Sequence, residues 1–230
     1  MLIDRIIAPY FETNCWILAL GTGQECIIVD PGMAQPNLVN EIEQKVSELK
    51  LKPVAVFITH GHLDHTFSVL PLTKQVPMRT FVTGDDRFLL TDPMGALDRG
   101  GVGEQFLTAF GLEKFKEPDE IVELEDFSTF EVAGMKITSI FAPGHTKGSV
   151  IFTVDDKQLI SGDVLFAGSI GRTDLPTGSA SQMRKTLRDR ILTLPDSLNV
   201  LPGHGGQTTI GTERVRNPYL QDDFLDQNGR

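Results

Sequence analysis

The sequence predicts an α/β fold in which two β-sheets pack face to face with helices outside, a four-layer αββα sandwich. Both halves of the chain contain short strand-like segments that are followed by a segment with helical spacing. Turn residues separate these segments. No repeat, linker or low-complexity tract interrupts them, so we expect residues 1–230 to form a single domain.

Three segments rich in apolar and β-branched residues begin the chain, and each is bounded by turn signals. They span residues 2–8, 14–20 and 25–32. A helix is expected after Pro36, because apolar residues recur there at helical spacing. They are Leu38, Ile42, Val46 and Leu49. A continuous apolar run at 54–58 indicates a buried strand, and another helix is expected over 66–74.

The second half is predicted to hold five more strands before its helix. They span 120–124, 127–132, 135–142, 149–154 and 158–163. An amphipathic helix is expected through Met183, Leu187, Ile191 and Leu194, and residues 199–205 indicate a last short strand and loop. Between the halves lies the glycine-rich segment 92–118, which we interpret as a candidate active-site flap.

The charge of the chain limits its partners. Lys and Arg number 21 against 31 Asp and Glu, and the resulting net charge of -10 repels nucleic acids and anionic membranes. No run approaches the roughly 18 apolar residues of a membrane helix, and the N-terminus lacks a secretory signal pattern. We therefore expect a cytoplasmic protein that binds neither nucleic acid nor membranes. Cys15 and Cys26 lie in apolar stretches and are expected to be buried, reduced thiols.

The histidines are the most informative residues. All five lie in loops that follow predicted strands, and four of them adjoin glycine. They are His60, His62, His65, His145 and His204. A lone histidine is usually a hydrogen-bonded structural residue, but His60 and His62 alternate in an extended stretch, so their rings project to the same side. Asp64 and His65 fall on the following turn and face a neighbouring point.

Asp163 ends another predicted strand and supplies a second carboxylate, although an aspartate at such a position is often only a turn or capping residue. Five imidazoles and two carboxylates exceed the four positions of one tetrahedral zinc ion. They can fill two sites that share Asp163 and leave room for a water molecule. The sequence therefore predicts a centre of two metal ions.

The motif THGHLDH resembles the His-x-His-x-Asp-His signature of the metallo-β-lactamase superfamily. The segments VDPG, PGHTKGS, SGDVLF and LPGHG are similar to its further motifs, in the same order, so the resemblance covers essentially the whole chain. Within the superfamily, GSIGRTDLPTG (168–178) and residues 203–220 resemble the short bacterial glyoxalase II (hydroxyacylglutathione hydrolase) type of thioester hydrolase. The resemblance implies the metallo-β-lactamase fold.

The resemblance also implies roles for individual residues. It places one metal on His60, His62 and His145, and the other on Asp64, His65 and His204. Asp163 would bridge the two metals, and Asp64 and Asp163 would be the catalytic carboxylates. Asp30 would lie behind the ligands and orient one imidazole; otherwise it is a turn residue at a strand end. Two zinc ions per chain are expected, and the same ligand types also accept iron or manganese.

The implied reaction is hydrolysis of a thioester of a low-molecular-weight thiol by a metal-bound hydroxide. Arg172 and Lys147 are the candidate substrate-binding cations; alternatively, Arg172 pairs with Asp174 and Lys147 is only solvated. Long glyoxalase II enzymes add a helical region that helps to hold glutathione, whereas 26 residues follow His204 here (230 − 204). The thiol carrier, the acyl group and the oligomeric state therefore stay open.

Other functions remain as alternatives. Persulfide dioxygenases share this fold and the GRTD segment, and they would hold one iron on His60, His145 and Asp163. A hydrolase of small esters or lactones, or a binding module that metals only brace, is a weaker alternative. The LPTG after GRTD and the GGQTTIG near the end are more similar to the thioester hydrolases, so we expect hydrolysis.

Overall fold

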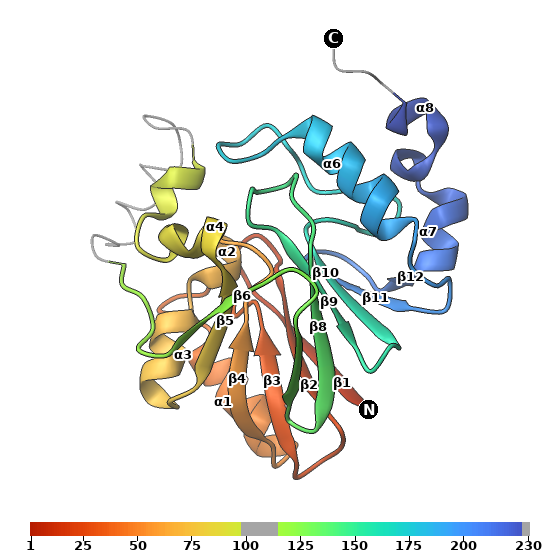
Figure 1. Cartoon of the computed structure of the whole chain (residues 1–230). Coiled ribbons are helices and arrows are strands. Elements are labelled where there is room, and N and C mark those ends of the chain that lie inside the picture. The colour runs from red at the N-terminus through yellow and green to blue at the C-terminus, as the bar shows by residue number, and fades with distance from the viewer. Residues whose placement is uncertain (98–114, 227–230) are drawn as a thin grey trace.

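Two six-stranded β-sheets face each other in the computed structural model, which describes residues 1–97 and 115–226 (Figure 1). The strand order of the first sheet is β1-β2-β3-β4-β5-β6. Its strands are β1 (Leu2–Ile7), β2 (Asn14–Ala19), β3 (Glu25–Val29), β4 (Lys52–Phe57), β5 (Arg79–Thr83) and β6 (Ile121–Leu124). The first three strands pair antiparallel, whereas β3 to β6 run parallel, so β3, β4, β5 and β6 all end at the same edge.

The second sheet is mostly antiparallel, in the order β12-β11-β10-β9-β8-β7. Its strands are β7 (Thr129–Val132), β8 (Met135–Phe141), β9 (Val150–Val154), β10 (Gln158–Gly162), β11 (Asn199–Pro202) and β12 (Thr208–Thr209). One pair, β10 and β11, is parallel, so these two strands also end side by side. Both sheets therefore offer neighbouring carboxyl ends from which loops can carry functional side chains.

Helices cover the outer face of each sheet (Figure 1). On the first sheet these are α1 (Val39–Glu48) and α3 (Val69–Gln75), whose buried residues pack against β3, β4 and β5. On the second sheet, α6 (Ala180–Thr186) continues as one π-helical turn, η3 (Leu187–Ile191), and packs against β8 to β11. The remaining short helices are α2 (Leu63–Thr66), α4 (Gly84–Arg87), η1 (Phe88–Leu90), η2 (Pro93–Ala96), α7 (Ile210–Arg216), η4 (Pro218–Leu220) and α8 (Asp222–Leu225). The predicted four-layer αββα sandwich is confirmed.

The core between the sheets is built around three phenylalanines. Phe57 stacks on Phe81 with ring centroids 4.3 Å apart, and Phe152 from the opposite sheet meets Phe57 edge-on at 5.2 Å. Such aromatic pairs stabilise a core by about 0.5–1.5 kcal/mol beyond the area that they bury. Phe57 ends β4, so this packing anchors the strand that leads into the histidine-rich loop.

Some elements differ from those predicted. β5 is not among the predicted strands, since Phe81 and Val82 are its only strongly apolar residues. The helices after His204 were also not predicted; of α7, Ile210 and Glu213 are the buried residues, so its apolar periodicity is weak. The helix expected over 66–74 is instead divided into α2 and α3. Of the candidate flap at 92–118, residues 98–114 lie outside the described residues.

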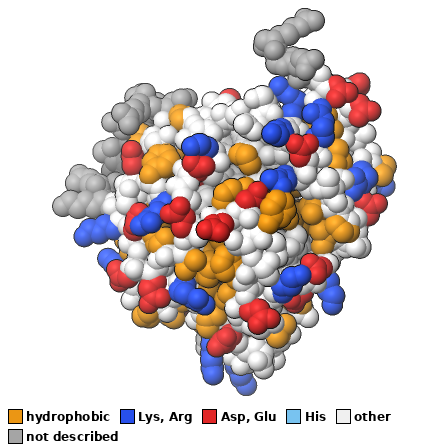
Figure 2. All heavy atoms as spheres, viewed as in Figure 1, with side chains coloured by type: hydrophobic (Ala, Val, Ile, Leu, Met, Phe, Trp, Pro, Cys, Tyr) orange, Lys and Arg blue, Asp and Glu red, His pale blue; other side chains and the backbone are white. Residues whose placement is uncertain are grey.

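Charged side chains of both signs lie on the surface. On the face drawn in Figure 2, acidic and basic side chains are interspersed rather than gathered into one large patch of either sign. Cys15 and Cys26 are free and buried, as predicted. None of the helices in the described part of the chain has the length and apolar character needed to cross a membrane.

Candidate metal centre

Seven side chains converge at the carboxyl ends of strands from both sheets. The loop after β4 and the following α2 carry His60, His62, Asp64 and His65. The loops after β8, β10 and β11 carry the other three residues, His145, Asp163 and His204. All seven predicted ligands therefore lie in one cluster, although they come from positions as distant as 60 and 204.

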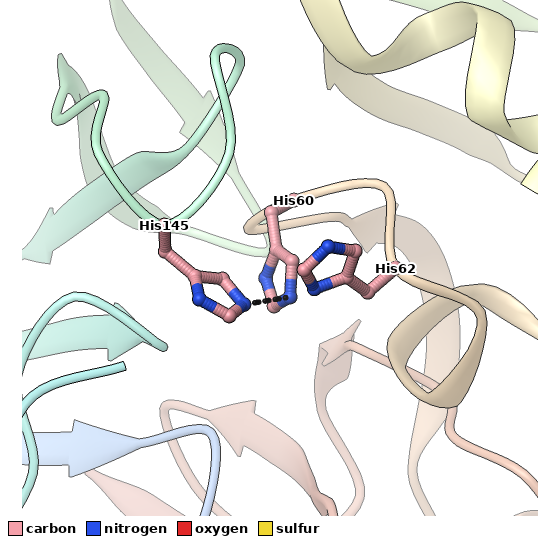
Figure 3. Close-up of side chains that lie close together, drawn as sticks. All are labelled: His60, His62 and His145. Carbon is pink, nitrogen blue, oxygen red and sulfur yellow. Dashed lines mark hydrogen bonds between the residues drawn. The ribbon is translucent and has the colours of Figure 1, made fainter. Parts of the chain in front are cut away.

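The first group consists of His60, His62 and His145, whose rings point toward one another (Figure 3). The Nε2 atoms of His60 and His145 are 3.2 Å apart, and all three side chains are buried. His145 Nδ1 lies 2.7 Å from the carbonyl oxygen of Arg172, so Nδ1 carries the proton and donates it to that carbonyl. The Nε2 atom of His145 is thereby left with a lone pair that faces the group.

The second group consists of Asp64, His65 and His204. The Nε2 atoms of His65 and His204 are 3.2 Å apart, and Asp64 Oδ2 lies 3.4 Å from each of them. On the far side of its ring, His65 Nδ1 donates to Asp30 Oδ2 at 3.0 Å. In the neutral ring its Nε2 is therefore the acceptor, and it faces a carboxylate and a second imidazole.

Asp163 lies between the two groups. Its Oδ1 is 3.4 Å from His65 Nε2, and its Oδ2 is 3.4 Å from His204 Nε2 and 3.5 Å from His145 Nε2. One carboxylate thus reaches a member of each group. This is the position that the sequence analysis expected for a bridging residue.

Asp30 contacts the side of the His65 ring that faces away from the cluster. Besides His65 Nδ1, its carboxylate accepts hydrogen bonds from the backbone N–H of Thr59 at 2.8 Å and from the Thr59 hydroxyl at 2.6 Å. Asp30 is buried and adopts a left-handed backbone conformation with φ of 49° directly after β3. Asp30 therefore lies behind an imidazole of the cluster, where the sequence analysis placed it, and its hydrogen bond to Nδ1 orients the His65 ring.

The two groups differ in electrostatics. Burial, together with the neighbouring imidazoles, lowers the pKa of His62 to about 3 and holds the pKa of His60 well below its usual value. Burial alone would also lower the pKa of His65 and His204, but Asp163 and Asp64 outweigh it and raise these pKa values to about 9 and about 10. His60 and His62 therefore present neutral lone pairs, whereas the second group attracts positive charge.

The cluster fits metal ions better than it fits a hydrogen-bond network. His62 Nε2 and Asp163 Oδ1 are buried without a hydrogen-bond donor among the described residues, although such atoms are normally satisfied. A buried acceptor without a donor is costly unless a cation satisfies it. Gly203 keeps this space open, since a Cβ there would collide with Asp163 Oδ1. The seven residues form a cluster of histidine and aspartate whose side chains could hold metal ions.

Asp86 is a residue of the site that the sequence analysis missed. It is fully buried in α4 and accepts hydrogen bonds from Gly61 N at 2.7 Å, Gly148 N at 2.8 Å and Thr146 Oγ1 at 2.6 Å. Its carboxylate therefore ties the His60–His62 loop of one sheet to the His145 loop of the other. Only the position of Asp86 shortly after β5 could have indicated it, and that strand was not predicted.

Thr13 and Asn14 are two further missed residues. The Thr13 hydroxyl donates to Asp64 Oδ2 at 3.0 Å, and Thr13 forms an isolated β-bridge with His204. Asn14 Nδ2 donates to the carbonyl oxygens of Pro202 and Gly205, both at 2.9 Å, and so holds the His204 loop on either side. These contacts join the start of β2 to the second group.

A cavity of about 670 Å³ adjoins the cluster and is also lined by Arg172. The Arg172 guanidinium binds Asp174 with two hydrogen bonds of 2.7 Å, the alternative that the sequence had left open. Lys147 does not line this cavity, and its Nζ pairs with Asp85 Oδ1 at 2.6 Å instead. The structure thus brings Arg172, but not Lys147, to the cluster.

The chain is similar to several known proteins. A family model described as "Metallo-beta-lactamase superfamily" matches residues 8–204. An uncharacterized protein of Mycobacterium tuberculosis is 39% identical over 96% of this chain and 98% of its own length. The protein named Hydroxyacylglutathione hydrolase GloC, from Haemophilus influenzae, is 32% identical over 96% of this chain and 98% of its own length.

Several solved structures share the fold. The BLEG-1 B3 metallo-beta-lactamase superposes with a TM-score of 0.80 at 29% identity, over 95% of this chain and 99% of that one. TTHA1623 in a di-iron-bound form has a TM-score of 0.76 at 29% identity, over 94% of this chain and 100% of that one. ETHE1 from Myxococcus xanthus has a TM-score of 0.76 at 22% identity, over 98% of this chain and 89% of that one. This similarity shows a common fold alone.

Proposed function

Because the chain belongs to the metallo-beta-lactamase superfamily, we propose that it hydrolyses a thioester of a low-molecular-weight thiol at a centre of two metal ions. The position of Asp163 carries the proposal, because its carboxylate lies within 3.4–3.5 Å of ligand nitrogens from both groups. A site for one ion would need no such shared carboxylate. The name of the Haemophilus influenzae relative supports the thioester, and the di-iron form of TTHA1623 supports two metals.

We propose that His60, His62 and His145 hold one ion and that Asp64, His65 and His204 hold the other. Zinc suits these ligand types, as do iron and manganese. Metal ions held by these residues would supply a water ligand of lowered pKa and would polarise a carbonyl oxygen, so that no separate protein base would be needed.

The residues of the chain position and orient the reactants. Asp30 fixes the tautomer of His65, and the carbonyl of Arg172 does the same for His145, so that both Nε2 atoms keep their lone pairs inward. The cavity beside the cluster receives the thioester. In the overall reaction, water adds to the carbonyl carbon, the C–S bond breaks, and a carboxylate, a thiol and one proton are released. A thiol with a pKa near 8.5 leaves readily as thiolate, so the reaction does not depend on a protein acid.

A persulfide dioxygenase with one iron is the second candidate. One observation favours it: the Nε2 atoms of His60 and His145 lie 3.2 Å apart, and Asp163 Oδ2 is 3.5 Å from His145, as one ion would need. In that enzyme, however, His204 would bind no metal. The cluster of His204 with Asp64 and His65 therefore favours the hydrolase.

The decisive experiment combines metal analysis with two assays on protein purified from its own host. For the hydrolase we expect about two metal ions per chain and release of free thiol from a thioester. For the dioxygenase we expect one iron and oxygen consumption with a persulfide; that result would overturn the proposal.

The His204→Ala variant distinguishes the two candidates further. It removes a ligand of the second group only, so we expect the metal content to fall by about one ion per chain and thioester turnover to be lost. Metal content is measured by atomic emission after desalting. If the variant kept its full metal content and activity, the two-metal assignment would be wrong.

A further inference from the structure

The walls of the cavity beside the metal-binding cluster are apolar. Apart from the cluster residues, Gly171 and Arg172, its lining consists of Phe11, Leu63, Ala96, Leu97, Phe166 and Leu175. A volume of about 670 Å³ lies within the range of sites that enclose a whole small ligand. Such a cavity gains binding free energy from apolar surface that it removes from water.

Phe166 is a wall residue that contacts the cluster. Its ring meets the ring of His204 edge-on, with centroids 5.9 Å apart and an interplanar angle of 88°. A group attached to the carbon that reacts at the cluster would therefore lie against Phe166. Phe166 can therefore determine which group the site accepts.

A buried polar network holds the turn that carries Phe166. Glu213, which is buried, accepts hydrogen bonds from the backbone N–H of Gly168 at 2.7 Å and from Asn217 Nδ2 at 2.9 Å. The same Asn217 group donates to the carbonyl oxygens of Phe166 and Ser169 at 3.3 Å and 3.0 Å. A turn with this many satisfied contacts is preorganised, so its aromatic wall can bind a ligand at little entropic cost.

The charge of Arg172 is compensated within the chain. Its guanidinium and the Asp174 carboxylate form a bidentate pair, which cancels most of the attraction that the cation would exert on an anionic ligand. Among the described residues that line the cavity, the features available for recognition outside the cluster are therefore mainly apolar.

We propose that the physiological substrate is a thioester with an apolar hydrocarbon or aromatic group next to its carbonyl or sulfur, and that Phe166 is a specificity-determining residue for that group. This inference rests on the proposed thioester hydrolysis and narrows its substrate class. The group can belong to the acyl side or to the thiol side, because both flank the bond that breaks. Each buried methylene should raise kcat/KM roughly fourfold, from the transfer free energy of a CH₂ group.

The test measures kcat/KM of the metal-loaded protein on matched thioesters. In one arm, acetyl, butanoyl and hexanoyl groups are attached to N-acetylcysteamine; in the other, an acetyl group is attached to ethanethiol, butanethiol and hexanethiol. Lactoylglutathione is the polar reference. We expect kcat/KM to rise with chain length in at least one arm and to exceed the value for lactoylglutathione. A flat response in both arms, with lactoylglutathione preferred, overturns the inference.

Variants test whether Phe166 causes the dependence of kcat/KM on chain length. In Phe166→Ala, the ratio of kcat/KM for the longest compound of an arm to kcat/KM for the shortest should fall roughly tenfold. Phe166→Leu keeps an apolar wall and should retain most of that ratio. Phe127→Ala is the matched control, because Phe127 is 57% exposed and does not line the cavity. Equal dependence in wild type and Phe166→Ala, with unchanged metal content, would overturn the role of Phe166.

A binding measurement separates this inference from the proposed function. Calorimetry with S-methyl and S-hexyl thioethers of N-acetylcysteamine, which cannot be hydrolysed, reports the apolar preference alone. If the S-hexyl compound binds more tightly in wild type but not in Phe166→Ala, the cavity assignment holds even where no thioester is cleaved, and only the proposed hydrolysis fails. If thioesters are cleaved but the two thioethers bind equally, hydrolysis stands and the apolar preference is wrong.

Discussion

The Nδ1 atoms of His65 and His145 decide what the opposite ring nitrogens can bind. Each Nδ1 donates to an oxygen outside the cluster, Asp30 Oδ2 for His65 and the Arg172 carbonyl for His145. A neutral imidazole has one N–H, so in the neutral ring that metal binding requires, each Nε2 carries the lone pair. At the scale of single residues, the site is thus prepared for a cation by side chains and carbonyls that do not themselves reach it.

Asp30→Asn should weaken metal binding. An amide at this position has one acceptor oxygen, whereas the Asp30 carboxylate serves three donors from Thr59 and His65, so at least one donor loses its partner. Loss of such a partner behind a ligand typically costs 10–100-fold in metal affinity, and we expect a fall of about that size. Competition against a chromophoric chelator measures it.

Asp126→Asn is the control for this variant, because Asp126 lies away from the cluster and pairs with Arg190. The control should keep the wild-type metal affinity. An Asp30→Asn protein that also keeps it would show that the orientation of His65 is secured by other contacts.

At the scale of elements, Asp86 joins two loops that approach the site from opposite sheets. One loop follows β4 and carries His60 and His62; the other follows β8 and carries His145. The carboxylate accepts a backbone N–H from each loop, at Gly61 and Gly148. The spacing of the first group of ligands therefore depends on a side chain from α4, which carries none of them.

Asp86→Asn should reduce metal binding at the first group and lower stability. The substituted amide turns an N–H toward a buried donor, and an unsatisfied buried polar group costs about 1–3 kcal/mol in the free energy of unfolding. Urea unfolding of the metal-free proteins measures that loss, and metal titration measures the affinity.

Asp85→Asn provides the matched control in the same helix, because Asp85 pairs with the exposed Lys147 instead of the two loops. Thr146→Ser should behave as wild type, since it keeps the hydroxyl that donates to Asp86. If Asp85→Asn and Asp86→Asn lost equal stability and affinity, the connection between the loops would not be the cause.

At the scale of the whole molecule, the cluster connects the two sheets. His60, His62, Asp64 and His65 follow β4 of the first sheet, and His145, Asp163 and His204 follow strands of the second. Each of the two proposed ions would take ligands from both sheets. A ligand that binds the folded chain alone stabilises it by mass action.

Removal of metal should therefore lower the thermal stability of the whole chain. With free metal at about 100 times its Kd, binding contributes about 2.7 kcal/mol, which corresponds to roughly 5–11 °C in Tm for a chain of this size. Calorimetric scans before and after dialysis against a chelator measure the shift. An unchanged Tm would mean that the cluster does not hold the sheets together through a cation.

Local patterns in the sequence predicted the fold class and the seven residues of the cluster. Strand and helix periods, turn residues and the spacing of histidines are properties of neighbouring positions, so the four-layer sandwich and the seven side chains of the cluster could be inferred from them. Only the tertiary structure decided how Asp86 joins two loops, how Asp174 pairs with Arg172, and how Phe166 forms the cavity wall. These contacts join residues through space, between sheets or within irregular loops, and local periodicity carries no information about which side chains such packing brings together.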